Sequence, residues 1–374
     1  MKKMERPFAG ATRAVTKLIL LFGLIFLSGC AAKEVDSRRY LWPIGGHSPK
    51  IEFIRTIASD RDVREGSESR VLEAILGIEE TRGIFGSPYD VAVDGRGRIY
   101  VSDLAKRDVL ILDLPNHQVR HFERPKHDEL YFESPMALAV GRDDVVYVSD
   151  NQQGRVYLFG SDLRLRKVIG QGHLTRPVGL ACDRERNLLY VADAGSHQVV
   201  VYDGNGEWLK SFGKRGSATG DFNYPLDLEV DTAGNLYVLD TMNARVQVFD
   251  TDGNFLRTFG ERGTSLGSFH MAKGIAVDRS GHVYVTDGVG HRFVIFDLAG
   301  NHLMTLGGRT STEGKLGLPG GFDMPKGIDA DAEDGIWVVD TFNRMVHKYQ
   351  FLNEKYLREH PIRSEEMALP GDLR

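Results

Sequence analysis

Three features of the sequence predict an all-β fold, a six-bladed β-propeller of four-stranded antiparallel blades. The tetrad aromatic-Val-x-Asp occurs six times, its Asp residues lie 43 to 53 residues apart, and Gly is unusually frequent. The tetrads end at Asp103, Asp150, Asp193, Asp240, Asp287 and Asp340. A unit repeated at this period has the size of one four-stranded blade. The 42 Gly among 374 residues are explained if each blade needs several tight turns.

Each copy contains the same elements in the same order. In the fourth copy a first strand covers 225–231, a Gly turn follows at 232–234, and the tetrad strand ends at Asp240. A third strand at 246–250, a second Gly turn and a fourth strand near 256–260 complete the unit. Short strands rich in Val, Ile, Tyr and Phe, separated by Gly and Asp turns, are typical of antiparallel hairpins.

The repeated unit resembles the NHL repeat. The fourth copy matches its three elements, Pro-x-Gly-(Val/Ile)-Ala-x-Asp, Gly-x-(Ile/Leu)-Tyr-Val-x-Asp and Arg-(Val/Ile)-x-Val-Phe-Asp, almost throughout 225–250. The resemblance covers roughly 77–350 and implies a six-bladed propeller.

The sixth copy lacks a clear fourth strand, and the sequence indicates where that strand comes from. Residues 52–57 match 254–259, an outer strand of the fourth copy. We therefore expect 51–57 to close the last blade, which leaves no unpaired outer edge there. The alternative is that 352–356 forms this strand. The propeller then covers 51–352, with a short helix near 69–76 and a polar tail at 353–374.

The N-terminus has the pattern of an export signal. Five basic residues within 1–17 precede the apolar run 18–27, which is too short to span a membrane as a helix. The tetrad Leu27-Ser28-Gly29-Cys30 resembles a bacterial lipobox, which implies cleavage of a signal peptide (1–29), lipidation of Cys30 and a tether over 30–50. Ala31 favours the outer membrane if the source is Gram-negative. The alternative is an uncleaved anchor; both place the chain at the cell envelope.

Charge and cysteine content exclude several classes of protein. Residues 1–29 hold five basic residues and one acidic residue, so their removal changes the formal charge from −5 to −9. An acidic exported protein is unsuited to nucleic-acid binding. Two Cys cannot form a disulfide framework or a four-thiolate zinc site. Since Cys30 is assigned to lipid, we expect Cys182 to be a buried free thiol.

The candidate binding residues lie where the first strand of each blade starts and in the loop after each tetrad Asp. Both features occur on one face of a propeller, and these residues depart from the repeat consensus. At the channel mouth they are Tyr89, Asp90, Asp227, Lys273 and Lys326, and in the loops Lys106, His291 and Phe342. We expect Lys273 and Lys326 to pair with Asp90 and Asp227.

No catalytic residue and no cofactor is predicted. The six tetrad Asp residues occur in every blade, and an Asp at a strand end commonly accepts hydrogen bonds from turn amides, so we assign them a structural role. Peptidyl-amidoglycolate lyases resemble this sequence in their repeat but place zinc-binding His after the first Pro of several blades. None of the six equivalent positions here is His. A calcium or zinc ion in the channel is kept as an alternative.

The sequence favours a lipid-anchored binding or scaffold protein of the cell envelope, and leaves enzymatic activity open. Its partner would be a protein, a peptide or a glycan presented to the propeller face. The alternative function is a metal-dependent hydrolase or lyase, similar to lactonases or to peptidyl-amidoglycolate lyases. No Gly-x-Ser-x-Gly elbow, phosphate loop or His-Glu-x-x-His motif occurs in the chain.

Overall fold

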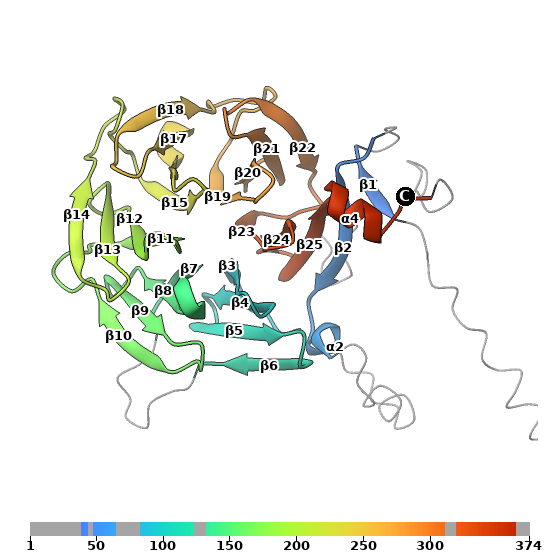
Figure 1. Cartoon of the computed structure of the whole chain (residues 1–374), viewed down its shortest axis with the longest axis horizontal. Coiled ribbons are helices and arrows are strands. Elements are labelled where there is room, and N and C mark those ends of the chain that lie inside the picture. The colour runs from blue at the N-terminus through green and yellow to red at the C-terminus, as the bar shows by residue number, and fades with distance from the viewer. Residues whose placement is uncertain (1–38, 44–47, 65–82, 123–131, 311–318, 364–374) are drawn as a thin grey trace, which may run out of the picture.

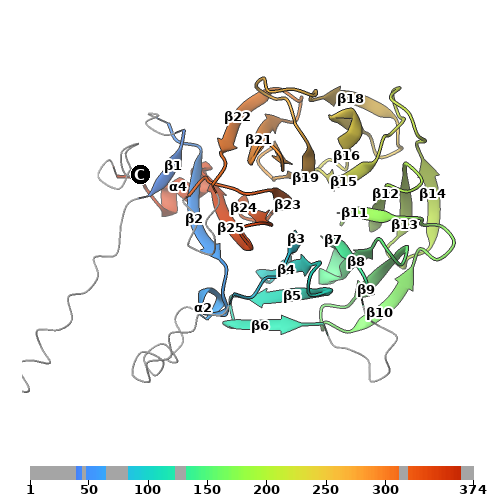
Figure 2. The same ribbon diagram turned by 180° about the vertical axis from the view of Figure 1, so that it is seen from behind.

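The computed structural model describes residues 39–43, 48–64, 83–122, 132–310 and 319–363. In this part six antiparallel sheets form a ring around a central channel (Figures 1 and 2). The all-β, six-bladed propeller predicted from the tetrads is confirmed. The expected signal peptide, Cys30 and the expected helix near 69–76 lie outside the described residues.

Each blade uses four consecutive strands, except the last, whose outer strands come from the N-terminal part of the chain. The bounds are β3 (Pro88–Val93), β4 (Arg98–Asp103), β5 (Asp108–Asp113) and β6 (Gln118–His121) in blade 1; β7 (Pro135–Val140), β8 (Val146–Asp150), β9 (Arg155–Phe159) and β10 (Leu165–Ile169) in blade 2; β11 (Pro177–Asp183), β12 (Leu188–Asp193), β13 (Gln198–Asp203) and β14 (Trp208–Phe212) in blade 3; β15 (Pro225–Val230), β16 (Leu236–Asp240), β17 (Arg245–Phe249) and β18 (Phe255–Phe259) in blade 4; β19 (Ala272–Val277), β20 (His282–Asp287), β21 (Arg292–Asp297) and β22 (His302–Gly307) in blade 5; and β23 (Pro325–Ala330), β24 (Gly335–Asp340) and β25 (Met345–Phe351) in blade 6.

The first strand of every blade lines the channel, and the fourth lies at the rim (Figure 1). Within a blade each strand pairs with the next strand along the chain, so a tight turn is enough to connect them. Gly253 and Gly300, between the third and fourth strands of blades 4 and 5, both have φ of 91°, a conformation that L side chains rarely adopt. Such positions account for the high Gly content.

The last blade is closed by β2 (Ile51–Ile57). This strand pairs antiparallel with β25, from Ile51 opposite Phe351 to Ile57 opposite Val346. This is the pairing expected from the match between 52–57 and 254–259. A hydrogen bond from the Val93 amide to Asp329 Oδ2, 2.7 Å long, also joins blade 6 to blade 1. The two ends of the ring are therefore joined at the rim and at the channel.

Two features at the chain ends were not expected from the sequence. Within the expected tether of 30–50, β1 (Tyr40–Trp42) pairs with β2 and gives blade 6 a fifth strand. The expected polar tail begins with a helix, α4 (Glu354–Glu359), whose N-cap residue Asn353 accepts a hydrogen bond from the Tyr356 amide. Both lie on the same side of the ring as β2 (Figure 2).

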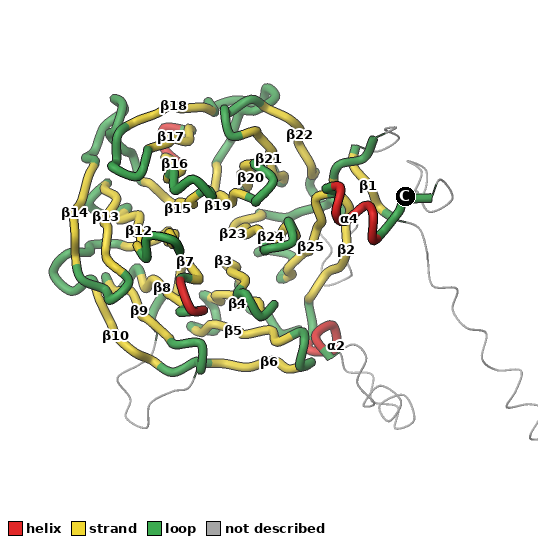
Figure 3. Tube along the Cα trace, viewed as in Figure 1, coloured by secondary structure: helices red, strands yellow, loops and turns green. Residues whose placement is uncertain are grey.

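Apart from α4, the helical segments of the described residues are a four-residue helix and two 3-10 turns (Figure 3). They are α2 (Asp60–Val63), η1 (Arg142–Asp144) and η2 (Thr241–Asn243). The core consists of clusters between neighbouring blades, built from Val, Ile and Leu of the second and third strands. The tetrad aromatic rings are buried in these clusters, and the Tyr284 hydroxyl donates to Asp278, which closes the turn after the first strand. Burial of these apolar side chains stabilises the ring.

Candidate functional site

The two faces of the ring are defined by the direction of the first strands. We call the face where they begin, at Pro88, Pro135, Pro177, Pro225, Ala272 and Pro325, the upper face. Each of these residues lies opposite the tetrad Asp of its own blade. The loops after the tetrads therefore also lie on the upper face, as the sequence predicted.

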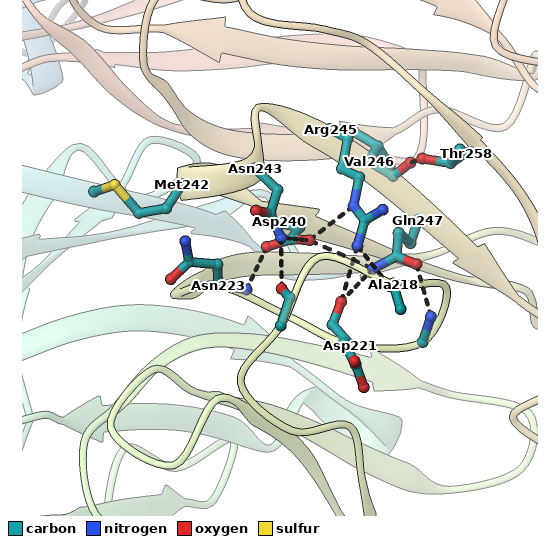
Figure 4. A network of polar contacts seen from close by, with 12 residues as sticks. Ala218, Asp221, Asn223, Asp240, Met242, Asn243, Arg245, Val246, Gln247 and Thr258 are labelled. Atoms are coloured by element: carbon teal, nitrogen blue, oxygen red, sulfur yellow. Dashed lines mark hydrogen bonds and ion pairs between the residues drawn. The ribbon is translucent and has the colours of Figure 1, made fainter.

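The tetrad Asp residues hold the loops of this face in place. All six are fully buried. Asp240 accepts hydrogen bonds from the Asn223 amide at 2.6 Å, the Asn243 side chain at 2.8 Å and Arg245 Nε at 2.9 Å (Figure 4). In the other blades too, the tetrad Asp accepts an amide from the loop that leads into the first strand. These bonds tie two loops of each blade together.

Asp90 and Asp227 occupy equivalent positions in blades 1 and 4 and connect blades. Asp90 Oδ2 accepts the Leu138 amide of blade 2 at 2.8 Å, and Asp227 Oδ2 accepts the Ile275 amide of blade 5 at 2.9 Å. On the other side Asp90 contacts Gly327 of blade 6. A Cβ at Gly327 would lie 2.2 Å from Asp90 Oδ1, so a residue without a side chain is needed there to leave room for the carboxylate. The geometry gives both side chains a role in joining neighbouring blades.

Lys273 and Lys326 follow the first residue of adjacent first strands and lie half-buried at the upper mouth of the channel. Within the described part of the chain neither forms an ion pair, so the expected pairing with Asp90 and Asp227 is wrong. Those carboxylates bond to backbone amides deeper in the channel. Lys326 Nζ instead lies 4.6 Å from the centroid of the Tyr89 ring, a cation–π distance.

The two lysines are poorly solvated cations that influence each other. Burial and the nearby charge of Lys273 lower the pKa of Lys326 to about 8. Burial also lowers the pKa of Lys273. Tyr89, beneath Lys326, has a raised phenol pKa because of burial and the nearby Asp90 and Asp227. The mouth therefore holds two cations whose charge is not neutralised by a described carboxylate.

The three loop candidates differ in what they present to solvent. Lys106 Nζ donates to the Ile84 carbonyl, which holds its own loop in place. His291 Nδ1 lies 3.4 Å from Asp323 Oδ1, within the protein. Phe342 has 62% of its surface exposed. Of these three, only Phe342 offers a free side chain on the upper face.

Phe342 belongs to a set of exposed side chains that was not predicted as a group from the sequence. The second residue after the tetrad Asp is Met242, Val289 and Phe342 in blades 4, 5 and 6, and all three are exposed large apolar side chains. We call these three residues the apolar arc. The same position holds Ala105, Gln152 and Gly195 in blades 1, 2 and 3. Comparing this position across the six copies would have found the arc in the sequence.

The apolar arc adjoins the two lysines. A Cβ added at Gly288, next to Val289, would lie 3.0 Å from Lys273 Cγ and 2.9 Å from Met324 Sδ. Met324 also accepts the Thr341 amide at its carbonyl, and Thr341 precedes Phe342. In blade 4, Thr241, which precedes Met242, donates from Oγ1 to the Ala272 carbonyl at 3.2 Å. The loops of the arc therefore pack on the segments that carry Lys273 and Lys326.

A cavity of about 470 Å³ occupies the channel from its middle to the lower mouth. Its lining includes Asp90, Cys182, Asp227, Glu229 and Asp329. Burial is the main cause that raises the pKa of Glu229 to about 8 and of Asp329 to about 6. Burial also raises the pKa of the Cys182 thiol, which keeps it protonated. The lower channel is therefore rich in carboxyl groups, with Arg184, Arg186 and Arg279 also in its lining, whereas the upper mouth holds the two lysines.

The described side chains do not form a metal centre. No group of three or more His, Cys, Asp or Glu residues among them is arranged to hold a metal ion. The acids of the channel accept backbone amides instead, as Asp90, Asp227 and Asp329 do. In the described ranges no helix has the length and apolar character needed to cross a membrane.

Fold and repeats together define the class: the chain is a six-bladed β-propeller with repeats of the NHL type. Family models match it as "6-bladed beta-propeller" over residues 231–306 and as "NHL repeat" over residues 174–202. The E3 ubiquitin-protein ligase NHLRC1 of Rattus norvegicus is 36% identical over 61 residues, which are 16% of this chain and 15% of the ligase. The protein from Mus musculus gives the same match. The likeness is therefore confined to a small part of both chains.

Solved structures share the fold over most of the chain. A protein of unknown function from Bacteroides thetaiotaomicron has a TM-score of 0.57 and 19% identity, covering 72% of this chain and 70% of that one. An auxiliary nutrient binding protein from the same organism has a TM-score of 0.55 and 15% identity, with coverage of 72% and 70%. Virginiamycin B lyase from Staphylococcus aureus has a TM-score of 0.52 and 10% identity, and the match covers 81% of this chain and 99% of the lyase. At these identities the likeness concerns the fold alone.

Proposed function

We propose that this protein is a lipid-anchored binding module of the cell envelope that captures a partner on the upper face of blades 4 to 6. The observation that carries the proposal is the placement of the apolar arc beside Lys273 and Lys326. Exposed apolar side chains that are grouped on one part of a surface mark interaction sites more often than scattered ones do. Here they sit next to two cations without a described counter-ion.

The rigidity of the propeller supports a binding role. Inter-blade bonds from Asp90, Asp227 and Asp329 fix the channel, and the tetrad Asp residues fix the loops. A scaffold that holds its surface loops in one conformation loses little entropy when a partner binds. One structure with this fold is an auxiliary nutrient binding protein, which agrees with such a use of the fold.

A metal-dependent hydrolase or lyase would need ligands that converge within the channel. Calcium takes six to eight oxygen ligands and catalytic zinc usually three protein ligands. The described acids of the channel use carboxylate oxygens to accept backbone amides, so the binding role has the stronger support.

The test is a comparison of variants in partner capture from intact envelopes. Phe342→Asp and Met242→Asp place a charge on the apolar arc, while Leu303→Asp places one at an equally exposed site on the outer strand β22. We expect both arc variants to lose the captured partner and Leu303→Asp to keep it. Equal capture by all three variants would contradict the assignment of the upper face.

A further inference from the structure

We propose that Lys273 and Lys326 form a carboxylate-binding subsite, and that the partner of the upper face is an acidic peptide segment whose apolar side chains lie on the apolar arc. This inference rests on the proposed binding function and names the chemistry of its ligand. It is carried by the two lysines, by the ring of Tyr89 and by the position of Met242, Val289 and Phe342 around them.

The two lysines differ from the other lysines of comparable burial. Lys348 is held by Asp331 at 3.4 Å, and Lys167 is held by Glu207 at 2.6 Å. Lys273 and Lys326 have no hydrogen-bond or ion-pair partner among the described residues. A half-buried ammonium group without an acceptor is costly, and a carboxylate that reaches both groups would remove that cost.

Tyr89 gives the subsite a floor. Its ring lies under Lys326 Nζ at 4.6 Å, so the ammonium group is held at the mouth and does not descend toward Asp90. Asp90 and Asp227, at the third positions of β3 and β15, accept backbone amides of the next blades and provide no positive charge for a ligand carboxylate. A ligand carboxylate is therefore expected to stop at the mouth, between the two lysines.

The recessed position of the lysines selects among partners. They are half-buried, whereas the arc beside them is exposed. A flat anionic membrane surface would contact the arc before it reached the lysines, but an acidic side chain or a chain terminus can project into the mouth.

The arc itself favours a peptide over a glycan. Sugar rings are usually bound by stacking on aromatic side chains, and Phe342 is the one aromatic member of the arc beside the aliphatic Met242 and Val289. Apolar side chains of a peptide gain from contact with Met, Val and Phe through burial of apolar surface. One carboxylate in the mouth and apolar side chains on the arc therefore fit a peptide in which acidic and apolar residues alternate.

The experiment selects random twelve-residue peptides on the purified exported part of the chain. We expect the selected peptides to combine Asp or Glu with Leu, Ile or Phe. Replacing the acidic residue by its amide should weaken binding to the wild-type protein tenfold or more. The double variant Lys273→Met, Lys326→Met should bind the acidic peptide tenfold or more weakly than the wild type does, and the amide replacement should not weaken its binding further. The control is the double variant Lys167→Met, Lys210→Met, whose substitutions lie on the outer strands β10 and β14, and it should bind as the wild type does. Peptides with free and amidated C-termini show whether the carboxylate comes from a side chain or from the chain end.

Each other outcome overturns part of the account. Selected peptides that bind through the arc, lose affinity in Phe342→Asp and ignore the double lysine variant would remove the carboxylate subsite and leave the binding face intact. Selected peptides that ignore both the lysine variant and Phe342→Asp would remove the upper face as well. A selection that enriches no peptide would contradict the peptide proposal, while partner capture from envelopes still tests the face independently.

Discussion

The Nζ atom of Lys326 lies 4.6 Å from the centroid of the Tyr89 ring, so the last and the first blade of the ring meet at the upper mouth of the channel. Lys326 is the second residue of β23, and Tyr89 is the second residue of β3. Equivalent positions in a closed ring become neighbours although 237 residues separate them in the chain. This contact between the two end blades also holds the Lys326 ammonium group at the mouth.

Binding of an acidic ligand should weaken as the pH rises through about 8. Burial lowers the pKa of Lys326 to about 8, and Lys273, whose pKa is also lowered, faces the same mouth with Tyr89, Asp90 and Asp227 nearby. Below pH 8 Lys326 is charged and attracts a carboxylate; above it the attraction is lost. We expect affinity to fall about fivefold between pH 7 and pH 9.5. Calorimetric titration of a selected peptide at both pH values measures this fall in affinity. The variant Lys326→Arg keeps its charge at pH 9.5, so its affinity should fall far less.

Replacing Lys326 by Met should make the folded protein more stable while it weakens binding. At pH 7 the folded state holds a desolvated charge that the unfolded chain solvates, and Met removes this cost. We expect a gain of about 1 kcal/mol in the free energy of unfolding. Since the folded pKa is depressed, wild-type stability rises with pH between about 8 and the unfolded value of about 10.4, and the advantage of Met should shrink there. Urea unfolding at pH 7 and pH 9.5 measures the difference; a variant less stable than the wild type at pH 7 would refute the argument.

Asp240→Ala should destabilise the protein strongly, because Asp240 holds two loops of the upper face in place. The substitution leaves the Asn223 amide, Asn243 and Arg245 without their shared acceptor in a buried site. We expect a loss of about 3–5 kcal/mol, as for other buried charged networks that lose one partner. Asp250→Ala is the control, because Asp250 accepts turn bonds at an exposed site, and it should cost about 1 kcal/mol or less. Similar losses of unfolding free energy in both variants would show that the buried hydrogen bonds of Asp240 stabilise the fold no more than the exposed bonds of Asp250 do.

The closing strand should be essential for the ring, and the residues before β1 should not. A chain that starts at residue 39 keeps β1 and β2, whereas one that starts at residue 58 exposes the edge of β25 and the side of the core that Ile51 and Ile57 cover. We expect the longer chain to unfold at the temperature of the exported protein and the shorter one to aggregate or to melt at least about 10 °C lower. A shorter chain with an unchanged melting temperature would mean that β2 does not stabilise the ring.

Lipidation of Cys30 stays a prediction from the lipobox, and one variant tests it. Cys30→Ser removes the thiol that would carry the lipid. We expect the variant to leave the membrane fraction of a bacterial host while the wild-type chain stays in it. Metabolic labelling with a fatty acid should mark the wild-type chain alone. Membrane retention of Cys30→Ser without label would favour the uncleaved anchor.

The repeat allowed the fold to be predicted from the sequence. It did not allow the side-chain contacts between neighbouring blades to be predicted. Six tetrads fix the blade number, and the match of 52–57 to 254–259 points to the closing strand. The short strand β1 matches no repeat element, so its three residues were assigned to a tether. Lys273 and Lys326 were expected to pair with Asp90 and Asp227, because the sequence does not show that those carboxylates bond to amides of the next blade. Exposure of Met242 and Val289 also depends on how far each loop stands out from the face.

The most direct test of the binding face is photo-cross-linking in intact envelopes. A photoreactive amino acid placed at Phe342 should give one dominant adduct with a partner, and the adduct should disappear in the double variant Lys273→Met, Lys326→Met. The same amino acid at Leu303, half of which is exposed on the rim, should not give that adduct. An identical adduct at both positions, or an adduct at Phe342 that persists at full strength in the lysine variant, would contradict the account.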